Sequence, residues 1–265
     1  MIVVGELINA SRKAIGQAIE KKDEQTIRKA AADQAAGGAD YIDVNAGVFM
    51  EQEPDYLKWL VQTVQDETEK PCCIDSPSPA AIEAALSVHR GTAMINSISL
   101  EAERWQSLLP VVSGTELKVV ALCMSDDGMP ETADQRLAIA DRMINALMKH
   151  GVALKNIHVD PLVQPVSTRG DFGIQFLDAV EKIMHEFAGV HTMCGLSNVS
   201  YGLPQRKLLN QVFLAMAIAR GLDGAIVNPL DRRMMATIAA AEALAGKDEY
   251  CMNYLKAFRS GALDT

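Results

Sequence analysis

The sequence predicts one α/β domain over residues 1–265, folded as a single (β/α)8 TIM barrel. Eight short apolar runs alternate with helical patterns along the whole chain, and no linker or change of composition separates them. Strands and helices that alternate at this spacing form a parallel sheet, and eight such units close into a barrel of about 250 residues. An open doubly wound sheet is the alternative, but residues 5–9 read GELIN and lack the G-x-G-x-x-G turn of that fold.

The expected strands are short apolar runs, most of which end at an Asp or an Asn. We expect them at residues 2–5, 41–44, 72–74, 93–95, 118–123, 156–159, from 191 onward, and at 224–227. Short apolar runs bounded by polar and turn residues are typical of strands buried on both faces.

Helical spacing of apolar residues predicts the elements between the strands. These helices are expected at 12–21, 24–36, 54–68, 79–89, 100–112, 132–150, 171–187, 205–220, 232–245 and 249–258. Ser78 and Pro79 are suited to begin a helix, whereas Gly37 and Gly151 are suited to end one.

Composition restricts the function classes. Hydrophobic residues make up 49% and the net charge is −9, which favours a large core and argues against nucleic acids and anionic membranes as partners. No apolar run has the length of a membrane span, and residues 1–5 lead directly into polar residues, so we expect neither a membrane segment nor a signal peptide. The five cysteines lack disulfide or zinc-site spacing, which indicates thiols in the reducing cytoplasm.

Acidic and amide side chains follow most of the expected strands. They are Asp43, Asn45, Asp75, Asn96, Asp160, Asn198 and Asn228. The carboxyl ends of barrel strands converge on one mouth, so we expect these side chains to form a single cup that contains no Lys, Arg or His. Any one of them could instead serve its own turn, because Asp and Asn are common in turns.

Such a cup suits an uncharged ring that carries many hydrogen-bond donors. A carboxylate can accept two parallel N–H bonds from an aminopyrimidinone edge, and amides can serve ring oxygen and nitrogen atoms. Sugar phosphates fit poorly without a cation or a glycine-rich nest, and glycosidase chemistry fits poorly without paired Glu acids. Three Asp residues could hold Mg²⁺, but they alternate with amides around the ring, and we expect no metal site.

The stretch HTMCGLSNVS at 191–200 is expected to be central to the site. It begins as an apolar strand, is broken at Gly195, and presents Asn198 before Pro204 opens the next helix. A neutral amide at the end of a rigid strand can both donate and accept hydrogen bonds. The alternative is that Asn198 only satisfies the backbone of its own loop.

Six segments spread over the chain resemble those of the pterin-binding methyltransferases. They read GELIN at 5–9, DVNAG at 43–47, IDS at 74–76, MINS at 94–97, DP at 160–161 and GLSNVS at 195–200. The family includes methyltetrahydrofolate:corrinoid/iron–sulfur protein methyltransferases and the tetrahydrofolate methyltransferase components of corrinoid-dependent demethylase systems. The resemblance implies a homodimeric (β/α)8 barrel that moves a methyl group between N5 of tetrahydrofolate and the cobalt of a corrinoid carried by a partner protein, in either direction.

The resemblance also implies roles for individual residues. Asp75, Asn96 and Asp160 would hydrogen-bond the pterin ring of tetrahydrofolate or 5-methyltetrahydrofolate. Asn198 would reach N5 and stabilise the charge that develops there during transfer. The remaining residues of the predicted substrate site are Asp43, Asn45, Ser197 and Arg206. Arg206 can also be interpreted as a solvated residue in the first turn of a helix.

Two other pterin-binding functions are alternatives. Dihydropteroate synthase shares the barrel and the pterin site, but its basic pair after strand seven and its Arg-x-His after strand eight are missing here. A pterin-binding subunit without activity would carry the same cup. Within the methyltransferases, Tyr201 stands where the corrinoid/iron–sulfur enzymes carry a Gln, in a loop expected to face the corrinoid. The change therefore concerns the choice of partner and the preferred direction of transfer, and not the pterin cup.

The helix expected at 249–258 is a candidate dimer contact. Tyr250, Tyr254 and Phe258 lie on one face of it, at positions i, i+4 and i+8. The alternative is that this aromatic face covers the bottom of the barrel.

Overall fold

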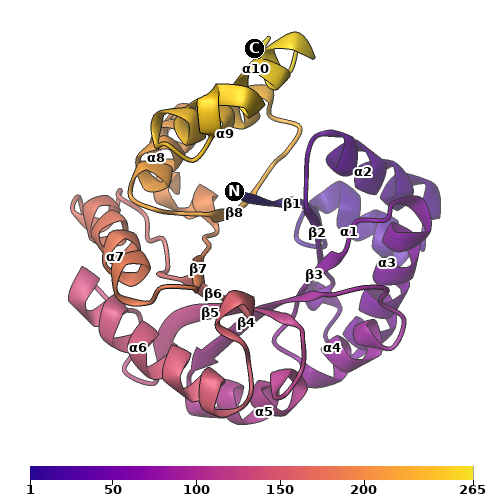
Figure 1. The fold of residues 1–265 in the computed structure, drawn as a ribbon. Coiled ribbons are helices and arrows are strands. Elements are labelled where there is room, and N and C mark those ends of the chain that lie inside the picture. The colour runs from indigo at the N-terminus through magenta and orange to yellow at the C-terminus, as the bar shows by residue number, and fades with distance from the viewer. Residues whose placement is uncertain (265) are drawn as a thin grey trace.

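A computed structural model describes residues 1–264 as a ring of eight parallel strands surrounded by helices (Figure 1). The strands follow one another in the hydrogen-bonded order β7-β6-β5-β4-β3-β2-β1-β8. Their bounds are β1 Ile2–Asn9, β2 Tyr41–Asn45, β3 Cys72–Asp75, β4 Met94–Leu100, β5 Lys118–Ser125, β6 Ile157–Asp160, β7 His191–Thr192 and β8 Gly224–Val227. The predicted (β/α)8 barrel is confirmed.

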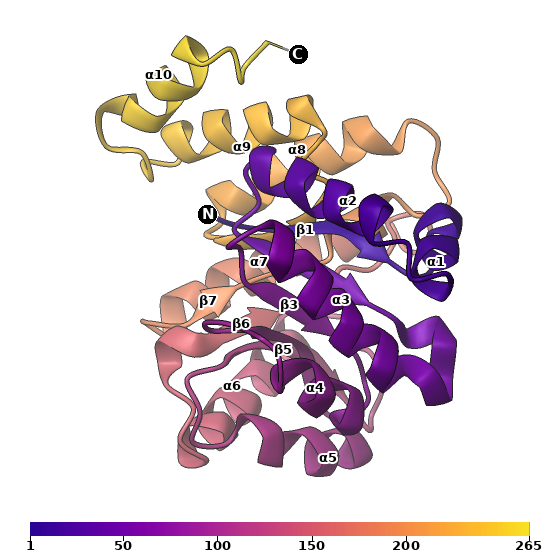
Figure 2. The ribbon, with the colours of Figure 1, turned by 90° about the vertical axis from the view of Figure 1, so that its right-hand side faces the viewer.

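Ten α-helices of the described residues cover the outside of the ring. They are α1 Lys13–Glu20, α2 Glu24–Ala36, α3 Glu53–Glu67, α4 Pro79–Leu86, α5 Ala102–Val112, α6 Ala133–Lys149, α7 Phe172–Glu186, α8 Arg206–Ala219, α9 Arg232–Leu244 and α10 Met252–Arg259. Four 3-10 turns, η1 Gly47–Gln52, η2 Leu154–Asn156, η3 Leu196–Ser200 and η4 Glu249–Cys251, lie between them. The helix α10 lies outside α9 at the edge of the molecule (Figure 2), so it does not cover the bottom of the barrel.

Two strands, β1 and β4, extend four or more residues beyond their predicted ends towards the mouth. The prediction ended β1 at Gly5, but Asn9 still pairs with Asn45 of β2. Asn96 was expected to end β4, yet pairing continues to Leu100, which lies opposite Ser125 of β5, and α5 therefore begins two residues later than predicted. The physical reason is that inward positions near a barrel mouth can be polar, so an apolar run ends before the ladder of backbone hydrogen bonds does.

The joint between β7 and β8 is the weakest in the ring. Only one bridge, between Gly195 and Ile226, joins the two sides of this joint. At the opposite end of β7, the side chain of Asp223 makes the contacts that a backbone ladder between β7 and β8 would otherwise make. One carboxylate oxygen accepts the backbone N–H of Thr192 at 2.7 Å, and the other lies 2.6 Å from Nδ1 of His191. A side chain therefore holds the barrel closed where backbone pairing is short.

Removal of this side chain should loosen the barrel. We expect Asp223→Ala to lower the free energy of unfolding by about 1–3 kcal/mol, because the amide of Thr192 loses its charged partner in a partly buried place. Urea denaturation of both proteins measures the change. Asp134→Ala is the matched control, since Asp134 is exposed and pairs only with Lys182; exposed ion pairs contribute little. Equal effects of the two substitutions would contradict the prediction.

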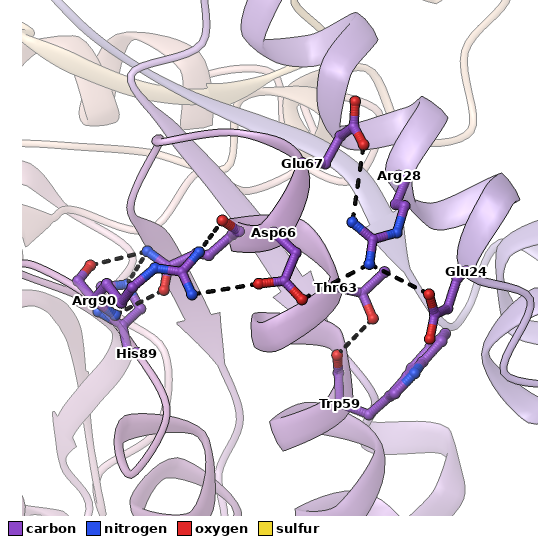
Figure 3. A network of polar contacts seen from close by, with 9 residues as sticks. Glu24, Arg28, Trp59, Thr63, Asp66, Glu67, His89 and Arg90 are labelled. Atoms are coloured by element: carbon purple, nitrogen blue, oxygen red, sulfur yellow. Dashed lines mark hydrogen bonds and ion pairs between the residues drawn. The ribbon is translucent and has the colours of Figure 1, made fainter.

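Ion pairs on the outer surface join α2, α3 and the segment after α4 (Figure 3). Arg28 of α2 lies within ion-pair distance of three carboxylates: Glu24 at 3.3 Å, Asp66 at 3.7 Å and Glu67 at 3.9 Å. Arg90 reaches Asp66 at 3.4 Å. Pairs of this kind contribute little individually, so the stability of the helix layer comes mainly from its buried apolar faces.

The inside of the barrel is mainly apolar at its floor, where the buried His158 lies opposite Val120 in the pairing of β5 with β6. One buried cluster there consists of Val4, Tyr41, Cys73, Met94, Val120 and Met193. The carboxyl ends of the same strands carry the polar residues that the sequence singled out. Side chains therefore fill the barrel as a packed core, and a ligand can approach only from the mouth.

No helix of residues 1–264 is long and apolar enough to cross a membrane.

Candidate functional site

The centre of the mouth is formed by neighbouring strands. Asp75 at the end of β3 lies opposite Asn96 of β4 in the ladder. From the next strand on the other side, Asn45 donates its amide N–H to Asp75 Oδ2 at 3.0 Å and to the Asp75 carbonyl at 3.2 Å. The structure thus brings together three of the predicted residues, and Asn45 fixes the direction of the Asp75 carboxylate.

Asp43 lies one layer deeper and is almost completely buried. It is opposite Cys73 in the pairing of β2 with β3, and its Oδ1 has no hydrogen-bond partner among the described residues. Burial, followed by repulsion from Asp75, raises the pKa of Asp43 well above its usual range. Burial also raises the pKa of Asp75, against the hydrogen bond from Asn45. The pair therefore favours one shared proton over two negative charges.

Asp160 ends β6 on the next part of the rim. It is 8% exposed, and its Oδ1 accepts the backbone N–H of Leu162 at 2.8 Å. Burial raises the pKa of Asp160 to about 6, although the amides of Leu162 and Gly195 oppose this shift. Near neutral pH the side chain is a carboxylate held in a dry place, which makes it a strong acceptor for the N–H groups of a ligand.

Asn198 lies in η3, directly after β7, and its side chain is exposed. A Cβ on Gly195 would lie 3.7 Å from Asn198 Nδ2, an ordinary contact distance, so the amide lies close to the backbone of Gly195. None of the hydrogen bonds within residues 1–264 uses the amide of Asn198. The alternative that this amide serves its own loop is therefore not supported, and the amide is free to bind a ligand.

Arg206, the first residue of α8, braces this loop. Its Nη2 donates to the carbonyl of Ser197 at 2.7 Å and its Nε donates to Ser200 Oγ at 3.1 Å. It is exposed, as the solvated interpretation requires, but it also fixes the two ends of the segment that contains Asn198. This contact assigns Arg206 a positioning role, and no bond of it points into the cup.

A cavity of about 120 Å³ opens beside η3. Its walls include Ser197, Asn228 and Glu6. Asn228 Oδ1 accepts the N–H of Leu230 at 2.9 Å, so the oxygen of this amide serves its own turn. Glu6 was not among the predicted site residues, although it directly follows the predicted strand at 2–5, because only Asp and Asn residues at strand ends were selected; in the structure it lies inside β1. Burial raises the pKa of Glu6, against the charges of Arg12 and Arg206.

The cup is less free of cations than predicted. Arg104 reaches from α5 to the carbonyl of Ser97 at 2.8 Å, and its charge lowers the pKa of Asp75. Glu53, at the start of α3, is buried with an Oε1 that has no partner among the described residues, near Asn45 and Gly47. Neither residue could be found from the strand ends, because both belong to helices.

The arrangement combines hydrogen-bond acceptors at the ends of β3 and β6 with the unbonded amide of Asn198 after β7. Within residues 1–264, no three His, Cys, Asp or Glu side chains are grouped so that they could hold a metal ion. Fold and mouth together define a (β/α)8 barrel for a flat, uncharged ring that is rich in N–H donors.

Comparison with known proteins agrees with this class. The family described as pterin binding enzyme matches residues 5–228, and this chain belongs to it. Over 265 residues the chain is 38% identical to methylcorrinoid:tetrahydrofolate methyltransferase of Eubacterium limosum, which covers 99% of this chain and 98% of that one. It is 31% identical over 242 residues to methionine synthase of Mycobacterium tuberculosis, and this match covers 86% of the chain but 20% of the longer protein.

Solved structures show the same fold. Dihydropteroate synthase from Xanthomonas albilineans in complex with 7,8-dihydropteroate superposes with a TM-score of 0.69 over 92% of this chain and 93% of that chain. The sequence identity is 18%, so this likeness concerns the barrel and not the reaction.

Proposed function

We propose that this protein transfers a methyl group between the cobalt of a protein-bound corrinoid and N5 of tetrahydrofolate. The observation that carries the proposal is the mouth itself, where Asp75, Asn96 and Asp160 lie on β3, β4 and β6 and the unbonded amide of Asn198 follows β7. The full-length relationship to a methylcorrinoid:tetrahydrofolate methyltransferase supports the same activity.

The acceptors of the mouth hold the pterin. Asp75 and Asp160 accept N–H bonds from the aminopyrimidinone edge, and Asn96, which can donate and accept, serves a ring atom between them. Asn45 orients Asp75 through its 3.0 Å bond. Asp43 lies beneath as a carboxyl whose raised pKa favours its protonated form.

Asn198 acts on the atom that reacts. When the methyl group leaves N5 for cobalt(I), the electron pair of the broken C–N bond stays on N5, which takes up a proton from solvent, and an N–H donor stabilises the charge that develops on N5 during the transfer. When N5 accepts a methyl group, its lone pair forms the new bond, the electron pair of the Co–C bond stays on cobalt, and N5 loses its proton to solvent; the amide oxygen can face the positive charge on N5 until then. A neutral amide serves both directions because it carries a donor and an acceptor.

The decisive experiment is a single-turnover assay with EDTA present. A methylated corrinoid protein is mixed with the enzyme and tetrahydrofolate, and the loss of the methylcorrinoid spectrum is compared with the appearance of 5-methyltetrahydrofolate. Loss of methylcorrinoid and formation of 5-methyltetrahydrofolate in equal amounts support the proposal. Folate binding by calorimetry without any transfer would favour the non-catalytic pterin-binding subunit instead.

Folate binding should depend on pH in one direction. As the pH falls through about 6, Asp160 becomes protonated and offers an O–H where the ring needs an acceptor, so affinity should fall. Below that point the loss should approach about tenfold per pH unit. Calorimetric titration of tetrahydrofolate between about pH 5 and about pH 8 measures the effect. An affinity independent of pH would contradict an ionised Asp160 at the pterin.

We also propose a homodimer that forms through the barrel helices and works in the cytoplasm. Four of the five free cysteines are buried, in keeping with a reducing compartment. The helix α8 exposes Leu208, Val212 and Met216 at positions i, i+4 and i+8, with exposed fractions of 61%, 52% and 47%. A stripe of this kind on a helix favours a protein partner.

Light scattering tests the dimer. The wild type is expected to have the mass of two chains, and Val212→Glu is expected to shift it towards one chain because the charge would be buried at the contact. Met129→Glu is the control, since Met129 is 60% exposed but lies on the loop between β5 and α6. A wild-type monomer would count against the proposal.

A further inference from the structure

Arg136 carries a charge in a place where charges are rarely found. It projects from α6 and is fully buried, yet no carboxylate of the described residues lies within ion-pair distance of it. Instead it donates to neutral oxygens of one loop: Nε to the Pro161 carbonyl at 2.7 Å, and Nη2 to the Leu162 carbonyl at 3.3 Å and to Gln164 Oε1 at 2.8 Å. A buried charge without a paired carboxylate is costly, so this one calls for a reason.

The loop that Arg136 holds is the one that orients Asp160. Leu162 has a φ of +66°, in the left-handed region that a leucine rarely adopts. The N–H of the same residue binds Asp160 Oδ1 at 2.8 Å, so the turn and the carboxylate are joined directly. The guanidinium bonds the carbonyls on both sides of that N–H, so it stabilises the turn from which Asp160 is held.

Arg136 also acts on this carboxylate through its positive charge. Among the groups that affect Asp160, the thiols Cys123 of β5 and Cys194 after β7 stay uncharged, because burial raises the pKa of each. The attraction of Arg136 lowers the pKa of Asp160 against the effect of burial. Around Arg136 itself, Arg169 repels it, whereas Asp171 on the loop before α7 attracts it.

We propose that Arg136 is a positioning residue for folate binding, which holds the loop at 161–164 and keeps Asp160 ionised as an acceptor for the pterin. The inference rests on the proposed function. This role explains why a guanidinium without an ion-pair partner is buried here: its positive charge acts on the carboxylate of Asp160, which binds the ligand. Arg136 does not touch the ligand, so it should affect affinity and its pH dependence more than the transfer step.

The test is the pH dependence of tetrahydrofolate affinity in two variants. Arg136→Met removes the charge and the donors at similar size, and should weaken binding at least about tenfold while moving the pH midpoint upward by about one unit. Arg136→Lys keeps a charge but not the two-carbonyl fork, so it should bind weakly with a midpoint near that of the wild type. A role in folding alone would not move the midpoint.

Gln164 supplies matched variants in which Arg136 stays in place. Gln164→Leu removes one bond and no charge, and should leave the midpoint unchanged. Gln164→Glu places a carboxylate at the 2.8 Å contact, compensates the guanidinium, and should raise the midpoint as Arg136→Met does. These variants decide the matter even if Arg136→Met fails to fold.

The wild type and the variants together distinguish a failure of the proposed function from a failure of the proposed role of Arg136. If the wild type does not bind tetrahydrofolate, the proposed function fails. If the wild type binds it and Arg136→Met and Gln164→Glu keep its affinity and pH midpoint, the inference about Arg136 is overturned while the function stands.

Discussion

Asn198→Ala is expected to slow methyl transfer by about 10²–10³-fold, the loss seen when one donor to a developing charge is removed. The affinity for tetrahydrofolate should fall much less, by about 0.5–1.5 kcal/mol, the contribution of one neutral hydrogen bond. The difference arises because the bond from Asn198 to N5 strengthens as charge develops, and such an interaction acts on rate more than on affinity. The amide has no partner in the free protein, so its removal leaves no buried group unsatisfied.

Single-turnover transfer between 5-methyltetrahydrofolate and a cobalt(I) corrinoid protein, beside equilibrium binding, separates the two quantities. Asn198→Asp should also be slow near neutral pH, because an ionised carboxylate cannot donate to N5. Asn145→Ala is the matched control, since its amide is exposed on α6 and bonds only Asp141. If rate and affinity fall by the same factor, Asn198 merely holds the ring, and the proposed electrostatic role is wrong.

The sequence contained the barrel and much of its mouth. Each of Asp75, Asn96 and Asp160 follows an apolar run, and in a parallel barrel such positions converge, so their proximity could be predicted without coordinates. The methyltransferase class and its tetrahydrofolate and corrinoid chemistry followed from six ordered motifs, and the relationship to a methylcorrinoid:tetrahydrofolate methyltransferase confirms that interpretation. The roles of the individual side chains remain predictions.

What the sequence could not supply concerns side chains that reach the mouth from elsewhere. Arg104 and Glu53 come from helices, and the pattern of strand ends carries no information about the direction of a helical side chain. Arg136 could not be recognised from the sequence either, because an Arg on a helix is usually exposed to solvent, and only the fold shows that this one is buried. The weak joint between β7 and β8 could not be predicted either, because it depends on how many backbone hydrogen bonds the two strands form, which residue types alone do not specify.

Asp160 should matter most for affinity. Asp160→Ala is expected to weaken tetrahydrofolate binding by about 1.5–3 kcal/mol, the range for hydrogen bonds that involve a charged group. Calorimetry at a pH above the pKa of Asp160 measures the change, and the transfer rate at saturating folate should fall far less than in Asn198→Ala. Asp178→Ala, whose carboxylate pairs with Arg220 on the outside of the barrel at 3.2 Å, is the control. Unchanged affinity would remove Asp160 from the pterin site.

Asp160→Asn should show that this affinity is obtained at the expense of stability. In the folded, ligand-free protein burial raises the pKa of Asp160 to about 6, whereas the unfolded chain keeps a value of about 3.9. The folded state therefore holds its proton more tightly, and stability falls as the pH rises from about 4 to about 6, with the full loss present above that range. An amide at this position has no proton to lose and can still accept the N–H bond of Leu162.

The Asp160→Asn variant should thus be about 1–3 kcal/mol more stable than the wild type near pH 8 and lose that advantage near pH 4. It should bind folate weakly at both pH values. Urea denaturation at the two pH values measures the difference. A wild type that is the more stable protein near pH 8 would mean that burial does not raise the pKa of Asp160 in the folded protein.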